Sequence, residues 1–234
     1  MAYLEGKNLV ASYGVVPILH ECSVEVEKGE LAVIVGPNGA GKSTVMRVLL
    51  GMLDATEGSV TLDGKDISML STQDRIAQGL AFVPQTKNVF PSMTVEENLQ
   101  MGGFIREDDI SKTIDEVYEL FPILYEKRKQ LAEELSGGQR QQVAFGRAMM
   151  TRPSVMLLDE PTAGVSPIVM DEIFSNILDV RNAGMAVLMV EQNAQQALNI
   201  ADKGFVLVSG RNEHTGTGKE LINDPEVRKK FLGG

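Results

Sequence analysis

The chain has 234 residues and a formal net charge of −10, with 43% hydrophobic and 23% charged residues. These values are typical of a globular protein, and they argue against a broad nucleic-acid surface, which needs clustered Lys and Arg. No apolar segment approaches the roughly 20 residues of a membrane-spanning helix, and the N-terminal residues lack the layout of a secretory signal. Cys22 is the single cysteine, which fits a reducing, cytoplasmic compartment, and we expect it to be a small packed residue.

The N-terminal segments predict strands on either side of a glycine-rich loop. Apolar and β-branched runs predict strands at residues 9–13, 23–27, 31–35 and 59–62, the last followed by a turn at Asp63-Gly64. Alternation of apolar and polar residues at 23–27 favours a half-exposed antiparallel sheet. The run 31–35 is entirely apolar, which predicts a buried strand, and residues 44–50 then predict a helix that ends at Gly51.

The loop between that strand and helix is the most specific motif of the chain. Its sequence is Gly36-Pro37-Asn38-Gly39-Ala40-Gly41-Lys42-Ser43-Thr44, which fits the pattern G-x-x-x-x-G-K-[ST]. In this pattern backbone N–H groups surround phosphates at a helix N-terminus, the lysine reaches the β- and γ-phosphates, and the serine hydroxyl ligates Mg²⁺. The alternative is an ordinary glycine-rich turn, but the spacing and the flanking strand favour a nucleoside triphosphate site.

A helical segment then interrupts an α/β pattern. Residues 81–83 predict a strand that ends at Pro84, whereas residues 95–150 have helical periodicity, with a capping box at Thr94 and Glu97. Beyond Pro153, strands are predicted at 155–158, 185–190 and 205–208. Further helices are predicted to begin at Ser166-Pro167, ending at Gly184, and at Asp224-Pro225. We therefore expect an α/β core of residues 1–88 and 153–234 and an all-helical insertion over about 89–152.

Two further motifs carry chemistry. Leu135-Ser136-Gly137-Gly138-Gln139 stands directly before a predicted helix, so Ser136 can cap that helix and the glycines leave N–H groups open to an anion. Taken in isolation, this motif could be no more than a helix cap that follows a loop. Asp159 and Glu160 follow the apolar run 155–158, so Asp159 suits Mg²⁺ and Glu160 could orient or deprotonate the attacking water. The alternative for this pair is the solvated start of a loop.

In this order, the motifs resemble those of the ATP-binding subunits of ABC transporters over essentially the whole chain. The resemblance implies one ABC ATP-binding domain over residues 1–234: a RecA-like P-loop NTPase core with an N-terminal antiparallel β subdomain and an all-helical insertion. It implies ATP and Mg²⁺ as cofactors, stacking of Tyr13 on adenine, and contact of Gln85 with Mg²⁺ and water. In isolation Tyr13 would be a packed strand residue and Gln85 a surface residue.

The resemblance also implies partners. Two ATPase subunits, in a homodimer or a heterodimer, would form a head-to-tail pair in which Ser136, Gly137, Gly138 and Gln139 of one subunit contact ATP held by the other. Transmembrane permeases, and indirectly a solute-binding protein, would complete the assembly, with no nucleic acid. The chain would then lie in the cytoplasm, bound through the permeases to the inner face of the cell membrane.

Two positions depart from the family pattern. Gln192 stands where a histidine is usual. Glutamine can donate a neutral hydrogen bond, but unlike histidine it cannot take up a proton and become positively charged. We expect Gln192 to sense phosphate less strongly than histidine would. Ser166 stands where an aspartate is usual, and it keeps the ability to cap a helix while losing the charge.

Residues 89–99, 190–193 and 227–233 are similar to ATPase subunits of bacterial high-affinity branched-chain amino acid importers. Urea, amide and neutral amino acid importers share the pattern, so the solute stays open. Two other classes are alternatives: an assembly or remodelling factor, which usually carries tandem cassettes or long coiled coils, and a P-loop kinase or GTPase, which would lack Leu135–Gln139.

Overall fold

The computed structural model describes residues 2–231. Its strands are β1 (Leu4–Tyr13), β2 (Val16–Val26), β3 (Leu31–Val35), β4 (Glu57–Leu62), β5 (Lys65–Asp66), β6 (Leu80–Val83), β7 (Val155–Asp159), β8 (Ala186–Val190), β9 (Lys203–Val208) and β10 (Arg211–Gly216). Its helices are α1 (Lys42–Leu49), α2 (Thr72–Ala77), α3 (Val95–Gly102), α4 (Ser111–Leu120), α5 (Pro122–Glu126), α6 (Gly137–Met149), α7 (Pro167–Asn182), α8 (Ala194–Ile200), α9 (Gly218–Asn223) and α10 (Pro225–Phe231), with a 3₁₀ turn at Ala132–Glu134.

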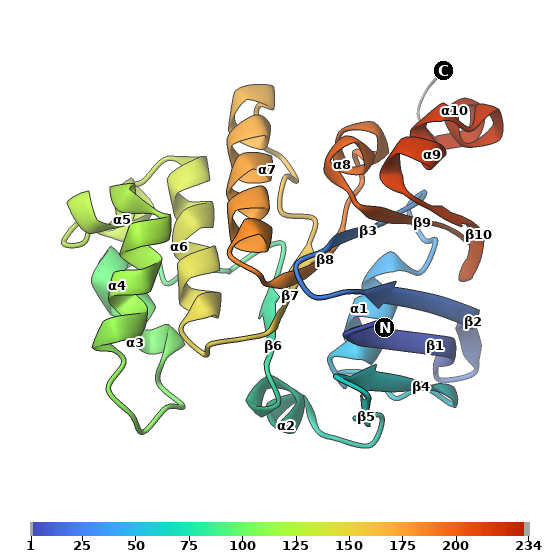
Figure 1. The fold of residues 1–234 in the computed structure, drawn as a ribbon, viewed down its shortest axis with the longest axis horizontal. Coiled ribbons are helices and arrows are strands. Elements are labelled where there is room, and N and C mark those ends of the chain that lie inside the picture. The colour runs from blue at the N-terminus through green and yellow to red at the C-terminus, as the bar shows by residue number, and fades with distance from the viewer. Residues whose placement is uncertain (1, 232–234) are drawn as a thin grey trace.

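The strands form a large, mostly parallel sheet and a small antiparallel one (Figure 1). The six-stranded sheet has the order β10-β9-β3-β8-β7-β6, in which only β10 runs antiparallel to its neighbour. The four-stranded sheet has the order β2-β1-β4-β5 and is antiparallel throughout. Helices α3 to α6 lie between β6 and β7 in the chain and form the lobe on the left of Figure 1. The architecture is the expected α/β class with an N-terminal antiparallel subdomain.

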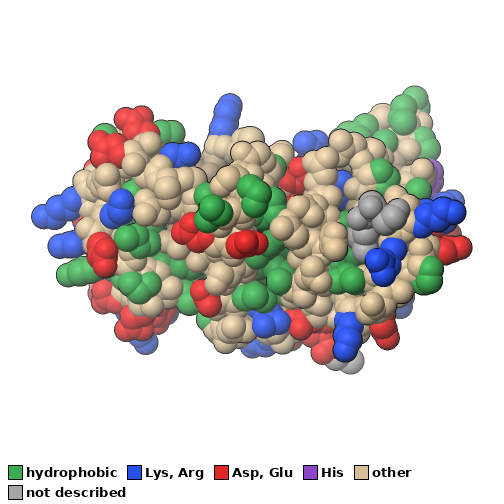
Figure 2. Space-filling view, turned by 90° about the horizontal axis from the view of Figure 1, so that it is seen from above, with side chains coloured by type: hydrophobic (Ala, Val, Ile, Leu, Met, Phe, Trp, Pro, Cys, Tyr) green, Lys and Arg blue, Asp and Glu red, His purple; other side chains and the backbone are tan. Residues whose placement is uncertain are grey.

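The surface carries charges of both signs. Figure 2, which looks down on the molecule of Figure 1 from above, shows Lys and Arg side chains singly or in small groups near both ends of this face, interspersed with Asp and Glu. Hydrophobic side chains appear in the middle of this face and also toward both of its ends. Within residues 2–231, every helix is too short or too polar to span a lipid bilayer.

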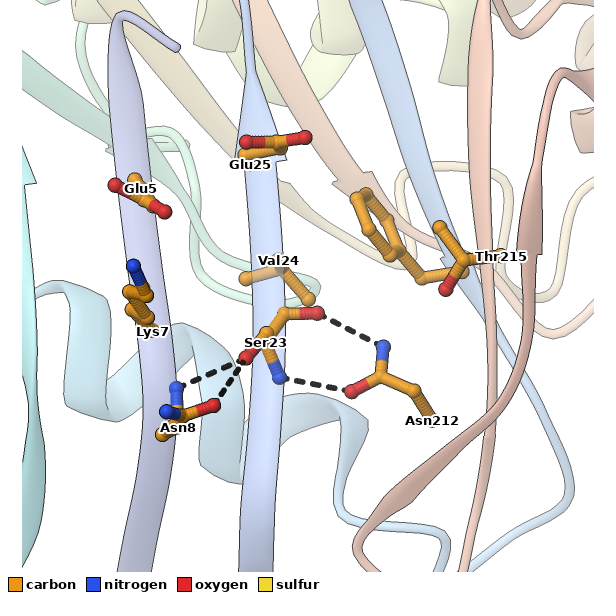
Figure 3. A pocket seen from close by; sticks show the side chains of 10 residues that line it. Glu5, Lys7, Asn8, Ser23, Val24, Glu25, Asn212 and Thr215 are labelled. Atoms are coloured by element: carbon orange, nitrogen blue, oxygen red, sulfur yellow. Dashed lines mark hydrogen bonds between the residues drawn. The ribbon is translucent and has the colours of Figure 1, made fainter.

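One asparagine joins the two sheets. Asn212 of β10 accepts a hydrogen bond from the Ser23 N–H through Oδ1 and donates one to the Ser23 carbonyl through Nδ2, both at 2.8 Å. The amide thus completes the outer edge of β2 as a neighbouring strand would (Figure 3). A groove of about 410 Å³ lies here, between β1 and β2 on one side and Phe205 and Thr215 on the other. The Asn212 and Ser23 side chains bond to groups of the chain itself, so this junction fixes the small sheet against the large one.

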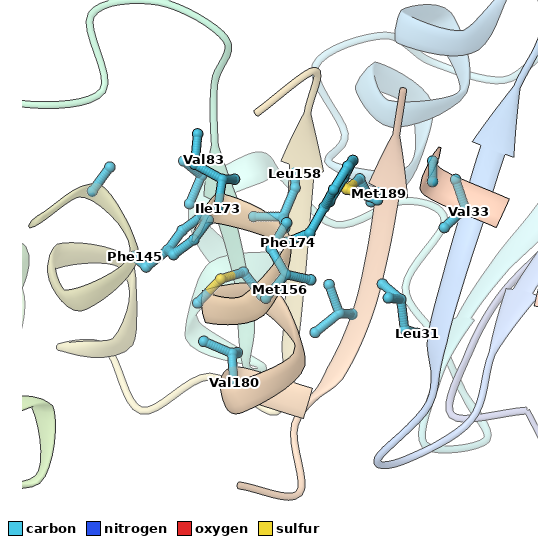
Figure 4. Close-up of a cluster of buried hydrophobic side chains, with 14 of the residues drawn as sticks. Leu31, Val33, Val83, Phe145, Met156, Leu158, Ile173, Phe174, Val180 and Met189 are labelled. Carbon is cyan, nitrogen blue, oxygen red and sulfur yellow. The ribbon is translucent and has the colours of Figure 1, made fainter. Parts of the chain in front are cut away.

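The large sheet separates two hydrophobic cores. Every second residue of its central strands faces α6 and α7 (Figure 4). Val33, Leu158 and Met189 lie on this face, where they belong to one cluster with Phe145, Ile173 and Phe174. The residues between them, such as Ile34 and Leu157, face α1 and the small sheet. Because both faces are covered, the strands consist of continuous apolar runs. Burial on both sides fixes the edge from which the site residues project.

Most local predictions are confirmed. The capping box at Thr94 and Glu97 is formed, Gly184 follows the end of α7 with a φ of 94°, and Cys22 is buried, which raises the pKa of its thiol to about 12. The predicted strands at 9–13 and 23–27 are parts of longer strands, β1 and β2. The predicted cap at Ser166 is wrong in one respect: Ser166 occupies the N-cap position, but its side chain makes no cap hydrogen bond.

Candidate functional site

The loop at residues 36–41 joins the carboxyl end of β3 to α1 and is built on left-handed glycines. Gly36 has a φ of 152°, and a Cβ there would lie 2.2 Å from the Leu207 carbonyl oxygen. Gly41, at the N-cap of α1, has a φ of 99°, which side chains other than glycine adopt only with strain. The close approach to β9 and this turn leave the first N–H groups of α1 without intrahelical partners, as an anion site requires.

Lys42 is folded along this loop. Its ammonium donates to the carbonyls of Gly36 at 2.9 Å and Pro37 at 3.3 Å, and only 5% of the residue is exposed. Burial lowers the pKa of Lys42, and the carboxylates of Glu160, Asp159 and Glu191 oppose that shift. The cation therefore lies within the electrostatic influence of three acidic side chains, beside the backbone N–H groups that a phosphate chain would follow.

Ser43 and Asp159 meet at this edge of the sheet. The Ser43 hydroxyl donates to Asp159 Oδ1 at 3.5 Å, so the first turn of α1 and the end of β7 are neighbours, as predicted. Burial raises the pKa of Asp159, while Ser43, Arg47 and Lys42 lower it. Among the described residues no group of three or more His, Cys, Asp or Glu could hold a metal by itself.

One hydroxyl and one carboxylate nevertheless fit Mg²⁺. This ion prefers oxygen ligands, keeps several waters, and is commonly bound by one or two protein groups together with substrate phosphates. The Ser43–Asp159 pair supplies hard oxygen donors directly beside the phosphate loop. The donor set therefore fits a nucleotide-associated Mg²⁺ better than a cage made by protein alone.

Glu160 and Gln85 also come together. Gln85 lies just beyond β6 and donates from Nε2 to Glu160 Oε2 at 3.1 Å. Glu160 has a φ of 45°, unusual for a residue with a side chain, and its N–H donates to the Val190 carbonyl at 2.9 Å. This left-handed turn directs the carboxylate to the phosphate loop, where Glu160 lines a groove of about 400 Å³ with residues 38–44.

The small sheet contributes Ile18 to the lining of this groove and places Tyr13 beside α1. Tyr13, at the end of β1, is 43% exposed and accepts a hydrogen bond from Arg47 of α1 at 3.0 Å. An exposed ring next to α1 is available for stacking on a base. Ile18 of β2 lines the groove. No sequence pattern indicated a role for Ile18, because an apolar residue in a strand is expected in a core.

The predicted motif at residues 135–139 lies elsewhere in the chain. Ser136 caps α6 in a capping box with Gln139, as expected. Gly138 packs closely on α7, since a Cβ there would lie 2.4 Å from Glu172 Oε2. Of the described residues that line the groove at the phosphate loop, none belongs to 135–139. In Figure 1, α7 stands between α6 and the part of the molecule that contains α1.

Gln192 follows β8 and borders a second hollow beside the phosphate loop. That hollow, of about 300 Å³, is lined by Gly36, Pro37, Asn38, Gln192, Ala194, Lys230 and Phe231. Glu191, the residue before Gln192, is almost completely buried and accepts hydrogen bonds from Thr162. Sequence reasoning gave neither Glu191 nor Thr162 a role; the available signal was a carboxylate directly after a fully apolar strand.

Comparisons with known proteins identify the family of the chain. A family model described as ABC transporter matches residues 19–163. The chain is 45% identical over 223 residues to BraG of Pseudomonas aeruginosa, a high-affinity branched-chain amino acid transport ATP-binding protein, covering 95% of this chain and 96% of BraG. It is 35% identical over 237 residues to LptB of Haemophilus influenzae, a lipopolysaccharide export system ATP-binding protein, covering 100% of this chain and 98% of LptB.

A solved structure is similar over the whole length. The ADP conformation of an ATP-binding cassette of an ABC transporter superposes with a TM-score of 0.90 at 32% sequence identity, covering 100% of both chains. The predicted fold class and resemblance are confirmed. The chain belongs to the ABC transporter family, as an ATP-binding cassette that hydrolyses ATP.

Proposed function

We propose that this chain is the ATPase subunit of an ABC importer that takes up branched-chain or related amino acids. One observation carries the choice of solute class: 45% identity to BraG over 95% of the chain, against 35% to LptB. Both relatives match almost end to end, so the difference lies in sequence rather than in domain content. Urea, amide and other solutes are the alternatives within the same proposal.

The residues around the phosphate loop are assigned roles in that reaction. Residues 36–44 bind the phosphates, with the Lys42 ammonium at the β- and γ-phosphates, and Tyr13 stacks on adenine. Ser43, Asp159 and Gln85 would hold Mg²⁺, which neutralises charge on the phosphates when bound. Glu160 orients or deprotonates the attacking water, and the Gln85–Glu160 hydrogen bond supports this assignment because it keeps both side chains at the same edge.

The residues at 135–139 act on a nucleotide held by another ATPase subunit. Their separation from the chain's own phosphate groove supports this role, because an anion site at the start of α6 would otherwise serve no phosphate. ATP would then join two subunits, and loss of the γ-phosphate would release them. A ligand that binds the closed pair better than the open one shifts the population toward closure. Transmembrane permeases convert that motion into solute movement at the inner face of the membrane.

Reconstituted transport tests this proposal. The full chain is purified together with its membrane subunits, placed in proteoliposomes with the cognate solute-binding protein, and assayed for ATP-dependent uptake of labelled leucine, isoleucine and valine. Glu160→Gln serves as the hydrolysis-deficient control. We expect uptake of at least one of these amino acids by the complex that contains the parent chain, and none by the complex that contains Glu160→Gln. Transport only of urea, an amide or a lipid, or recovery of the chain on ribosomes without membrane subunits, would overturn the assignment.

A further inference from the structure

A buried carboxylate, Glu191, lies behind the proposed catalytic edge. It directly follows β8, the strand between β3 and β7, and is 1% exposed. An ionised carboxylate is costly to bury unless several donors satisfy its oxygens. Three carboxylates, those of Glu160, Asp159 and Glu191, act to raise the pKa of Lys42, and of these three only Glu191 is buried.

The donors to Glu191 come from two different loops. Oε1 accepts from the Thr162 N–H at 3.1 Å and from the Thr162 hydroxyl at 2.8 Å. Oε2 accepts from the Gln192 N–H at 3.1 Å. Thr162 is itself 4% exposed, so its hydroxyl is not available to bulk solvent. Burial raises the pKa of Glu191, and the hydrogen bonds from Thr162, Gln192 and Asn193 lower it.

Both loops carry a residue of the proposed reaction. Thr162 is two residues beyond Glu160 in the turn that leaves β7, and the Ala163 N–H donates to the Glu160 carbonyl at 3.1 Å. Gln192 is the next residue after Glu191. The Glu191 backbone is fixed to the sheet, since its N–H donates to the Ile34 carbonyl at 3.1 Å. One side chain anchored on the central strands therefore ties the turn of Glu160 to the loop of Gln192.

We infer that Glu191 and Thr162 are positioning residues that hold Glu160 and Gln192 in one fixed arrangement at the nucleotide. The inference rests on the role proposed above for Glu160 and on the phosphate-sensing role that the sequence predicts for Gln192. Glu191 and Thr162 are both buried, and neither is among the described residues that line the groove at the phosphate loop. Their contribution is to the rate of hydrolysis once ATP is bound, because the phosphate-binding residues 36–44 belong to a different loop.

Substitutions at Thr162 separate this role from stability. Thr162→Val keeps the shape of the side chain and removes the hydroxyl donor, whereas Thr162→Ser keeps the donor. Thr113→Val is the matched control, because Thr113 is also buried, at 2% exposure, and its hydroxyl accepts hydrogen bonds from Arg106 and Arg152 in the helical lobe. In the assembled complex we expect kcat to fall about tenfold in Thr162→Val with KM for ATP unchanged. Thr162→Ser should restore most of the rate.

Glu191→Gln completes a double-mutant cycle. Either orientation of the new amide places its NH₂ group against donors of Thr162 or Gln192, so one loop loses its acceptor. In the Glu191→Gln background, the additional effect of Thr162→Val should fall below about twofold. If Glu191→Gln does not fold, the comparison of Val and Ser at position 162 still decides the question.

Three results would overturn the inference: a parent-like kcat in Thr162→Val, an equal loss in Thr162→Ser, or an equal loss in Thr113→Val. The readout is ATP hydrolysis alone, so it is distinguishable from a failure of the transport assay. A complex that hydrolyses ATP but moves another solute leaves the inference intact while overturning the amino-acid assignment.

Discussion

At the scale of single residues, Glu160 combines an unusual backbone conformation with the proposed role of general base. A non-glycine residue at a φ of 45° stores conformational energy, and such residues cluster at functional sites. The Glu160 carboxylate accepts from Gln85 and lines the groove at the phosphate loop. The isosteric variant Glu160→Gln keeps the size of the side chain and removes its basicity, so it isolates the chemical role from binding.

We predict that Glu160→Gln binds ATP as the parent does and loses at least about a hundredfold in turnover, since general-base catalysis contributes on the order of 10²–10⁴. Binding is measured by equilibrium titration with a fluorescent ATP analogue, and turnover by phosphate release. Glu119→Gln, on the exposed face of α4, is the matched control. Parent-like turnover in Glu160→Gln would remove Glu160 from this role.

Asp159 illustrates a conflict between stability and function. Burial raises the pKa of Asp159 above the unfolded value of 3.8, so the folded state disfavours the charged carboxylate. Above the folded pKa this charge lowers the free energy of unfolding, and below pH 3.8 the effect disappears because both states are protonated. We predict that Asp159→Asn, without nucleotide and with a chelator, unfolds at a higher temperature at pH 7.

The gain in Asp159→Asn should shrink as the pH falls through the folded pKa and vanish near the unfolded value of 3.8. Thermal melts between pH 3.5 and 8 would measure it, with the exposed Asp171→Asn as the control. A gain that is independent of pH would contradict the electrostatic explanation.

Gln192 is the neutral residue at the position where the family usually has a histidine. It borders the hollow beside residues 36–38 and can donate one uncharged hydrogen bond. We predict that Gln192→Ala lowers the ATPase rate of the assembled complex about three- to tenfold, which is the effect of losing one neutral hydrogen bond. An unchanged rate would show that Gln192 does not sense phosphate.

At the scale of elements, Arg75 of α2 holds the far end of the phosphate-loop helix. It is 3% exposed, and its guanidinium donates to the carbonyls of Val48 at 2.7 Å and Leu49 at 2.9 Å, at the end of α1. It also donates to the carbonyls of Ser68 and Leu70. A cation there satisfies carbonyls that have no partner within the helix and complements the helix dipole.

We predict that Arg75→Met lowers the free energy of unfolding by about 2–4 kcal/mol, because several buried carbonyls lose their donor. Urea unfolding followed by circular dichroism measures the change. Arg211→Met, whose side chain is 62% exposed, should change stability by less than about 0.5 kcal/mol. Equal effects of the two variants would show that the carbonyl contacts of Arg75 contribute little.

The elements also show what sequence reasoning can reach. The strands at 31–35 and 155–158 and the caps at Thr94 and Ser136 were predictable, because apolar runs and capping residues are local signals. β10 was missed, since it is an edge strand of polar residues with alternate positions exposed. Short helices such as α2, α8 and α9 bury only one to three residues each, too few for a detectable period.

The site residues also fall into a group that the sequence predicts and a group that it does not. The phosphate loop and Asp159-Glu160 are contiguous motifs whose residue types and spacing already carry the chemistry. The Glu191–Thr162 contact joins positions 29 residues apart, and no local pattern pairs them. Its existence follows from the parallel pairing of β7 with β8, which brings the ends of the two strands together.

At the scale of the whole molecule, the proposed function assigns the phosphate loop and the residues at 135–139 to two different half-sites. Each has donors suited to phosphate, yet Ser136 to Gln139 do not contribute to the described lining of the groove beside Lys42. Two copies, or this chain and a second ATPase, can complete both half-sites only by facing each other in opposite directions.

The most direct test is the structure of the assembled complex with Glu160→Gln, ATP and Mg²⁺. We predict that the Ser136 hydroxyl and the N–H groups of Gly137 and Gly138 lie within about 2.7–3.2 Å of a γ-phosphate whose other side is held by the phosphate loop of the opposing ATPase. Lys42 of this chain should hold the second γ-phosphate. A nucleotide-bound complex in which residues 136–138 face solvent, while each γ-phosphate contacts a single subunit, would contradict the account.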